Sequence, residues 1–138
     1  MFESIVVPVD LTERNRSAVE MAGRLSAPGG RVCLLHVIET IPGMSVDEQS
    51  AFYGKLEKRA SAHLRELGKM LEEKSVRWTA ELAYGPRAKT VLDEAEKLDA
   101  DLIVIQSHRV GDEVPSEGWG TLSYQIGIFA RCSVLLVK

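Results

Sequence analysis

The sequence predicts an α/β domain built on a doubly wound, five-stranded and mostly parallel sheet with helices on both faces. Short β-branched runs alternate with segments of helical periodicity in the order βαβαβαβαβ. Right-handed crossover helices between parallel strands cover both faces of such a sheet. The chain has 138 residues, of which 45% are hydrophobic and 27% charged, so one domain over residues 1–138 can bury a core of its own.

The first two strands and the helix between them are marked by their flanking residues. The run SIVVPVD, residues 4–10, is typical of a strand covered on both faces, and Pro8 is tolerated near its end, where the strand leaves the sheet. Thr12 is expected to cap the following helix, and the APGG stretch at 27–30 to end it. The run RVCLLHVI, residues 31–38, then predicts a second buried strand.

A long helix and an edge strand come next. Ser45 and Glu48 have the spacing of a capping box. The helix that they begin has an apolar face formed by Phe52, Leu56, Ala60, Leu64, Leu67 and Leu71. Residues 76–84, VRWTAELAY, alternate large apolar with polar side chains, which predicts a half-exposed strand at the margin of the sheet.

The C-terminal part continues the alternation. Gly85-Pro86 opens a third helix, whose inward face holds Ala88, Val91, Leu92, Ala95 and Leu98. ADLIVIQ at 100–106 predicts a central strand and SVLLVK at 133–138 a last one. Between them, TLSYQIGIFA at 121–130 predicts a fourth helix with an apolar face of Leu122, Ile126 and Phe129.

Charge and hydropathy exclude several classes of partner. The net charge is −3 and the basic residues are scattered among acids, so we expect no nucleic acid and no membrane as partner. No apolar run reaches the ~18 residues that span a bilayer, and no basic segment precedes a long apolar stretch at the N-terminus. We therefore expect a cytoplasmic protein.

The cysteines and two of the histidines are expected to be structural. Cys33 and Cys132 lie in or beside apolar runs without metal-binding spacing, which predicts reduced, buried thiols and no metal site. His36 lies within a predicted strand, and His63 lies at the margin of a helix's apolar face.

Candidate binding residues follow the first and fourth strands. In doubly wound sheets, ligands bind beyond the carboxyl ends of the strands, where the winding reverses. Asp10 ends the first strand, and Gln106, Ser107 and His108 end the fourth. Asp10 can accept hydrogen bonds from an adenine amine or a ribose hydroxyl, or from backbone donors in the turn to the first helix. His108 is either a phosphate-facing cation or general base, or a polar loop residue bonded to a backbone carbonyl.

Four segments, taken in their order and spacing, resemble the universal stress protein family along essentially all 138 residues. They are IVVPVDLTERNRSAVEMAGRLS, VCLLHVIE, AYGPRAKTVLDEAEKLDADLIVIQSH and GTLSYQIGIFARCSVLLVK. The resemblance implies the strand order 3-2-1-4-5, a homodimer, and an ATP site in members that keep G-x2-G-x9-G-[ST]. Carried over by position, it implies adenosine contacts at Pro8, Val9, Asp10 and Val37 and a phosphate loop from Gln106 to Thr121. We expect the dimer to form through the C-terminal strand at 133–138, because its VLLV run has apolar residues on both faces at an unpaired sheet edge.

The phosphate loop departs from the family pattern. Gln106 and Arg109 stand where the first two glycines are expected, and ten residues instead of nine separate Arg109 from Gly120-Thr121. Glycines let backbone amides approach phosphates and permit turns with φ > 0. Negative charge is added by Asp112, Glu113 and Glu117. The loop is therefore expected to bind ATP weakly, unless Gly111 and Gly118 build a different nest or Arg109 itself binds an anion.

Other classes of protein lack their motifs in this chain. Neither G-x-G-x-x-G nor G-x4-G-K-[ST] follows the first strand, which excludes a dinucleotide oxidoreductase and a P-loop NTPase. A response-regulator receiver would need a phosphoacceptor Asp where Tyr84-Gly85 ends the third strand. A hydrolase site from Ser107 and His108 is disfavoured, because adjacent residues of an extended segment point oppositely and no G-x-S-x-G elbow surrounds the serine.

The sequence thus predicts a dimeric, cytoplasmic, universal stress protein-like domain with a regulatory or protective role, without tight ATP binding and without an identifiable catalytic centre. No cofactor is expected, with ATP or AMP left open. The alternative is an ATP- or AMP-binding switch of the same family, with slow ATP hydrolysis. Regulatory protein partners are expected, and the sequence does not identify them.

Overall fold

Helices and strands alternate along the chain as the sequence predicts. The computed structural model describes residues 1–40, 42–107 and 122–138. The elements are β1 (Phe2–Pro8), α1 (Asn15–Leu25), β2 (Ser26–Ile38), α2 (Val46–Glu72), β3 (Arg77–Tyr84), α3 (Arg87–Lys97), β4 (Leu102–Gln106), α4 (Leu122–Phe129) and β5 (Ser133–Val137).

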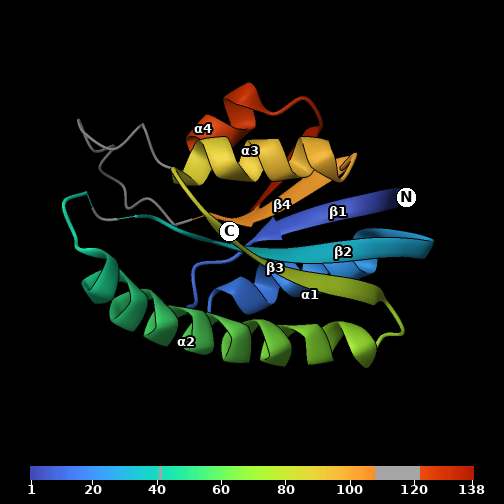
Figure 1. Cartoon of the computed structure of the whole chain (residues 1–138). Coiled ribbons are helices and arrows are strands. Elements are labelled where there is room, and N and C mark those ends of the chain that lie inside the picture. The colour runs from blue at the N-terminus through green and yellow to red at the C-terminus, as the bar shows by residue number, and fades with distance from the viewer. Residues whose placement is uncertain (41, 108–121) are drawn as a thin grey trace.

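The strands form one sheet in the order β3-β2-β1-β4-β5, in which every neighbouring pair among the described residues is parallel. The helices α1 and α2 cover one face of this sheet, and α3 and α4 cover the other (Figure 1). The predicted doubly wound sheet, its strand order and the position of β3 at an edge are therefore confirmed.

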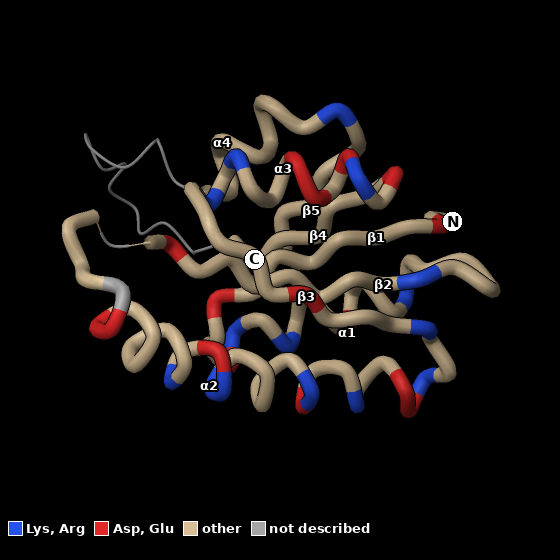
Figure 2. Tube along the Cα trace, viewed as in Figure 1, with Lys and Arg blue, Asp and Glu red and all other residues tan. Residues whose placement is uncertain are grey.

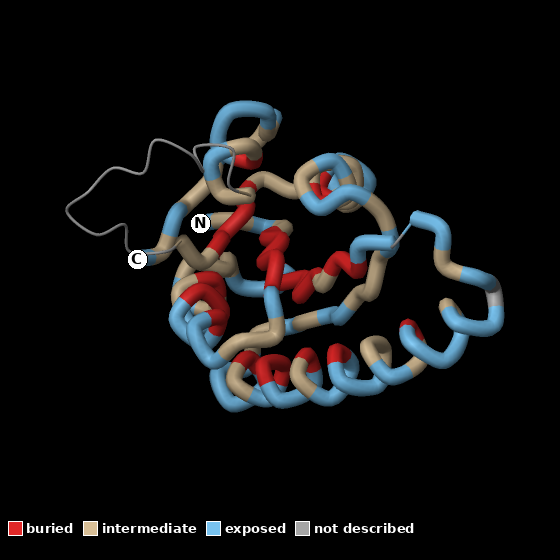
Figure 3. The backbone as a smooth tube through the Cα atoms, turned by 90° about the vertical axis from the view of Figure 1, so that its left-hand side faces the viewer, coloured by how far each residue is buried: buried red, intermediate tan, exposed pale blue. Residues whose placement is uncertain are grey.

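The core consists of two apolar layers, one on each face of the sheet. Because successive residues of a strand point to opposite faces, Ile5 and Val7 pack with residues of α1 and α2, whereas Val6 packs with residues of α3 and α4. These buried stretches run through the middle of the domain in Figure 3. The sequences of the central strands are continuously apolar because helices cover both faces of the sheet.

The boundaries of α1 differ from the prediction. The helix begins at Asn15 after Arg14 as its cap residue, and no side-chain hydrogen bond caps it, so the prediction of Thr12 as the N-cap is wrong. The helix does end before the APGG stretch, but that stretch belongs to β2, because pairing with β1 already begins at Ser26.

The helix α2 begins as predicted and packs largely as predicted. Ser45 Oγ accepts the Glu48 N–H and Glu48 Oε2 accepts the Ser45 N–H, each at 3.2 Å, which confirms the capping box. The inward face buries Ala60, Leu64, Leu67 and Leu71. Phe52 was expected on this face but is 41% exposed, and Tyr53 is 8% exposed instead. Tyr53 turns inward because its ring packs edge-on against Tyr84 of β3, with centroids 5.8 Å apart.

The last helix and the cysteines show two further departures. In α4, Ile126 is buried as predicted, but Phe129, the last residue of this short helix, is 68% exposed, so its predicted place on the buried face is wrong. Both cysteines are free. Burial raises the pKa of the Cys33 thiol to about 11, whereas Cys132 is only half-buried, so its predicted burial is not observed.

Charged residues of both signs lie close together along the helices in the part of the chain that the structure describes. Figure 2 shows basic and acidic residues interspersed along α2 and α3. Of the helices in the described ranges, none combines the length and apolarity needed to cross a membrane.

Candidate functional site

A cavity of about 310 Å³ lies at the carboxyl ends of β1 and β4. Its lining comes from the ends of β1, β2 and β4, from the start of α1, and from α3 and α4. In the sheet order, β1 lies between β2 and β4, so the winding reverses at this point. This is the place where doubly wound sheets bind ligands, and the volume lies at the lower end of the roughly 300–1,000 Å³ of small-molecule sites.

The structure brings half of the predicted site residues together around this cavity. Its lining includes Pro8, Val9, Asp10, Val37 and Gln106. Ser107 is directed elsewhere: its N–H donates to the carbonyl of Val137 at 2.7 Å, and Lys138 Nζ donates to its Oγ at 3.4 Å. The remaining predicted residues, His108, Arg109, Gly120 and Thr121, lie outside the described residues.

The turn after β1 is held by side-chain hydrogen bonds. Asn15 is only 2% exposed, and its Oδ1 accepts the N–H groups of Asp10 at 3.0 Å and of Thr12 at 3.3 Å. Asp10 Oδ1 accepts the Thr12 N–H at 3.0 Å and the Thr12 hydroxyl at 2.6 Å. Leu11 between them has φ of 66°, in the left-handed region that side chains other than glycine rarely adopt. These bonds therefore fix a strained turn that places Asp10 beside the cavity.

Asp10 carries a negative charge at neutral pH. Desolvation of its carboxyl raises the pKa, but the Thr12 hydroxyl and N–H and the Arg14 guanidinium outweigh this effect, so the pKa lies below its ordinary value of 3.8. The predicted bonding to donors in the turn is thus observed. A contact with a ligand amine or hydroxyl stays a prediction, for which the charged carboxylate is a suitable acceptor.

His36 connects β2 to the end of β1. Its Nδ1 lies 2.8 Å from the carbonyl oxygen of Val9, and because a carbonyl only accepts, Nδ1 carries the proton and donates. Burial lowers the pKa of His36 below its ordinary 6.5; the hydrogen bond to the Val9 carbonyl opposes this effect, and the nearby Arg87 guanidinium adds to it. The ring is therefore neutral at pH 7 and leaves Nε2 as an acceptor.

Gln106 contributes a buried acceptor to the cavity lining. Its Nε2 donates to the carbonyl of Val137 at 3.1 Å. Its Oε1 is shielded from solvent and has no hydrogen-bond partner among the described residues. An unsatisfied buried acceptor costs about 1–3 kcal/mol. Because Gln106 lines the cavity, its side-chain amide is a candidate contact for a ligand.

Arg87 gives the cavity a positive group. It follows the N-cap residue Pro86 at the start of α3, and its Nε lies 3.9 Å from Glu39 Oε1. Both side chains are more than half exposed, so this ion pair is weak. The guanidinium is thus available to an anionic group of a ligand.

Among the lining residues that the sequence analysis did not assign to this site are Asn15, His36 and Arg87. Asn15 falls within the helix that was expected to begin after Thr12. Its burial cannot be predicted from the spacing of apolar residues, because Asn15 is polar. His36 was expected to be structural, and its bond to Val9 agrees with that, but its position next to Val37 in β2 could have placed it at the site. Arg87 follows Gly85-Pro86 at a strand end, which was a usable signal for a residue facing the crevice.

Solved structures share this fold over nearly their full length. That of the hypothetical protein MJ0577 has a TM-score of 0.84 at 24% sequence identity, covering 100% of this chain and 96% of that one. A universal stress protein in complex with cAMP has a TM-score of 0.77 at 18% identity, covering 99% and 97%. A universal stress protein family protein from Arabidopsis thaliana with AMP bound has a TM-score of 0.70 at 18% identity, covering 98% and 90%.

The family itself is shown by the sequence. The model of the universal stress protein family matches residues 1–138, the whole chain. The strand order, the cavity at the winding reversal and this match agree with the resemblance found in the sequence. The chain belongs to the universal stress protein family.

Proposed function

We propose that this chain is a regulatory or protective universal stress domain whose cavity binds the adenosine part of a nucleotide, and which does not hold ATP tightly. The observation that carries the proposal is the cavity at the carboxyl ends of β1 and β4, whose lining includes Asp10, Arg87 and Gln106. Oε1 of Gln106 is buried and has no hydrogen-bond partner among the described residues. Proteins of the same fold that have been crystallised with cAMP or AMP support a nucleotide as the ligand class.

The cavity offers complementary groups to a nucleoside. The Asp10 carboxylate is charged and can accept hydrogen bonds from ribose hydroxyls. Val37 of β2 and Val91 of α3 contribute apolar side chains to the lining, which suits a base. Arg87 supplies a cation for one phosphate. Together these groups suit a nucleoside or its monophosphate.

The residues at the end of β4 disfavour tight ATP binding. Gln106 occupies the position of the first family glycine, and its side chain is tied to Val137. A side chain there keeps the backbone away from a phosphate. Arg109 occupies the position of the second family glycine, so contacts to phosphate are expected to be lost at two positions. Each lost contact to a charged phosphate costs about 1.5–3 kcal/mol, and the loss of two weakens ATP binding roughly a hundredfold or more.

Calorimetry with adenosine, AMP and ATP with magnesium tests this proposal. We expect AMP to bind and ATP to bind no more tightly than AMP, because the additional phosphates gain little. Gln106→Leu should weaken AMP binding, since it removes the buried acceptor at nearly constant volume. Gln49→Leu is the matched control, because it makes the same change in α2, outside the cavity lining, and likewise removes a side-chain bond to a backbone carbonyl, that of Met44.

Two results would contradict the proposal. If neither adenosine nor AMP binds, the cavity is not a nucleotide site. Micromolar ATP binding would instead favour an ATP-binding switch of the same family. The double change Gln106→Gly with Arg109→Gly examines the second case. It should raise ATP affinity, whereas a loss would identify Arg109 as an anion ligand.

A homodimer through β5 is part of the proposed function. In the sheet order β5 is an edge strand, and its Leu136 is 39% exposed. An apolar edge strand invites pairing with another chain, and two such edges can pair about a two-fold axis. Light scattering should show a dimer, and Leu136→Lys should convert it to a monomer. A parent chain that is monomeric at tens of micromolar would contradict the dimer.

A further inference from the structure

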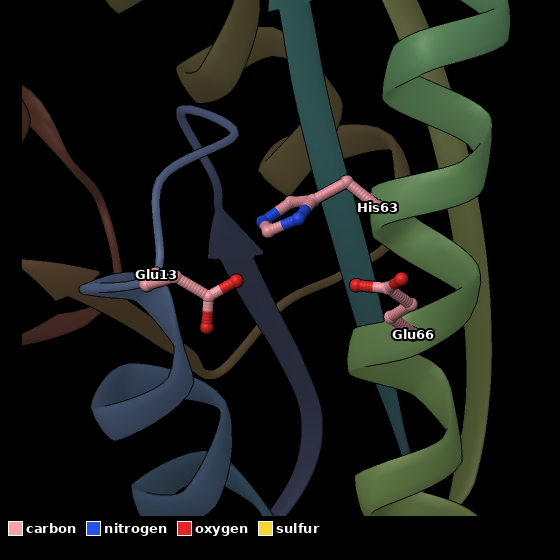
Figure 4. Close-up of side chains that lie close together, drawn as sticks. All are labelled: Glu13, His63 and Glu66. Carbon is pink, nitrogen blue, oxygen red and sulfur yellow. The ribbon is translucent and has the colours of Figure 1, made fainter.

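Three side chains with metal-binding chemistry converge on the α1–α2 side of the sheet, away from α3 and α4. Glu13 lies in the connection from β1 to α1, and His63 and Glu66 lie in α2. One ligand atom of each residue lies within 4.8 Å of the corresponding atoms of the other two. In Figure 4 the His63 ring points from α2 toward the segment that carries Glu13, and the Glu66 carboxylate extends from the same face of the helix.

The spacing within α2 explains why two of the groups are neighbours. Positions i and i+3 of a helix lie on one face, one turn apart. His63 and Glu66 have this spacing, so a single rigid helix presents an imidazole and a carboxylate side by side. Glu13 approaches them from a different element, which makes the cluster a product of the tertiary fold.

The His63 ring provides the independent observation. Its Nε2 is shielded from solvent and has no hydrogen-bond partner among the described residues. Buried polar atoms in native proteins are nearly always bonded, and an unbonded one needs an explanation. A bound ion in contact with Nε2 would satisfy this atom, and the two carboxylates would neutralise the ion's charge.

We propose that Glu13, His63 and Glu66 form a binding site for a first-row divalent cation, with Zn²⁺ as its preferred occupant. Zinc is commonly held by imidazole nitrogen and carboxylate oxygen, whereas Ca²⁺ and Mg²⁺ prefer oxygen ligands alone. Three protein ligands leave a coordination position for water. Binding requires the ligand atoms to move closer together, which is feasible because Glu13 and Glu66 are exposed side chains.

A competing contact to Glu13 is weak. Arg16 Nε lies 3.9 Å from Glu13 Oε2, and the two side chains are 51% and 77% exposed. Ion pairs of this kind contribute about 0–1 kcal/mol. A divalent cation would therefore displace Arg16 readily.

Equilibrium dialysis and native mass spectrometry of the intact protein with ZnCl₂ test the site. We expect one zinc ion per chain, and a melting temperature that rises with zinc concentration because the ion binds the folded state. Glu13→Gln, His63→Gln and Glu66→Gln should each lower zinc affinity about tenfold or more, since even outer-shell substitutions often have effects of this size. Glu73→Gln is the matched control, because it removes an exposed carboxylate just beyond the end of α2, outside the cluster.

The two glutamate variants keep the test decisive if His63→Gln folds poorly, because their side chains are on the surface. Chemical shift changes of the His63 ring on zinc addition would support the site directly. The proposal is overturned if zinc does not saturate at one ion per chain. It is equally overturned if all three variants bind zinc as the parent does, which would place the ion elsewhere, for example on the Cys132 thiol.

Discussion

Replacing Gly68 by alanine should destabilise the domain relative to the same change elsewhere in the same helix. A Cβ built on Gly68 would lie 2.3 Å from the nearest ring atom of Trp78, with two more ring atoms at 2.4 and 2.5 Å. The indole N–H of Trp78 donates to Glu72 at 3.1 Å, and the ring packs against the core layer under α1 and α2. The ring therefore cannot withdraw without losing packing or this hydrogen bond.

The magnitude follows from two opposing effects. Alanine in place of glycine in a helix gains about 1 kcal/mol, whereas overpacking a filled site costs roughly 1–3 kcal/mol. Gly54 lies in α2 as well, and no atom is within 4 Å of a Cβ built there, so Gly54→Ala keeps the gain alone. We expect Gly54→Ala to raise Tm by roughly 4 °C. Gly68→Ala should be about 1–3 kcal/mol less stable than that variant.

Urea unfolding of the parent and the two variants measures the difference. A further measurement in a Trp78→Leu background separates the clash from other causes, because the smaller side chain makes room and the Gly68→Ala penalty should shrink. Equal stabilisation by the two alanine variants, or a penalty unchanged in the Trp78→Leu background, would refute this account of how α2 packs on β3.

Two further predictions concern carboxylates and pH. The Asp101 carboxylate accepts hydrogen bonds from the N–H groups of Glu3 at 2.9 Å and Ser4 at 3.0 Å. Burial raises the pKa of Asp101, but these two hydrogen bonds outweigh burial and hold the pKa below its ordinary value of 3.8. Asp101→Asn should therefore lower the urea midpoint at pH 7, and the difference should vanish as the pH falls through the folded-state pKa; a difference that persists in acid would contradict this. Burial and, after it, the adjacent Glu94 carboxylate raise the pKa of Glu81 above 4.5. The contribution of protonated Glu81 to folding stability is therefore fully present below pH 4.5 and is lost as the pH rises through the folded-state pKa. Glu81→Gln should accordingly raise the urea midpoint at pH 7 and change it little below pH 4.5. Equal effects at both pH values would be evidence against repulsion between the Glu81 and Glu94 carboxylates.

Much of the fold could be predicted from the sequence, because it depends on local patterns that burial imposes directly. The continuous run ending at Pro8 is apolar because β1 has two covered faces, and the alternation from 76 to 84 reflects an edge strand. Where prediction failed, a tertiary contact decided between neighbouring residues. Tyr53 and not Phe52 turns inward because Tyr84 lies opposite it, which no period of 3.6 residues could indicate.

The site was predictable in position but not in its contacts. The end of β1 and the end of β4 meet because of the winding, a property of topology that the strand order already implies. The bonds of Asn15 to the turn depend on side-chain geometry after folding, and so does the burial of Gln106 Oε1 without a partner among the described residues. The same holds for Glu13 and His63, which are fifty residues apart in the chain and are neighbours only because α2 packs beside the start of α1.

The turn after β1 connects the proposed nucleotide cavity with the proposed cation site. Asp10 lies beside the cavity and Glu13 in the cation cluster, so the two are three positions apart in one short segment. The turn is strained at Leu11 and is held by Asn15 and by bonds between Asp10 and Thr12. A ligand that contacts Asp10 and an ion that contacts Glu13 would each stabilise the same geometry of this turn, so binding at one site would favour binding at the other. Because such coupling is reciprocal, zinc would raise the affinity for AMP by the same factor by which AMP raises the affinity for zinc.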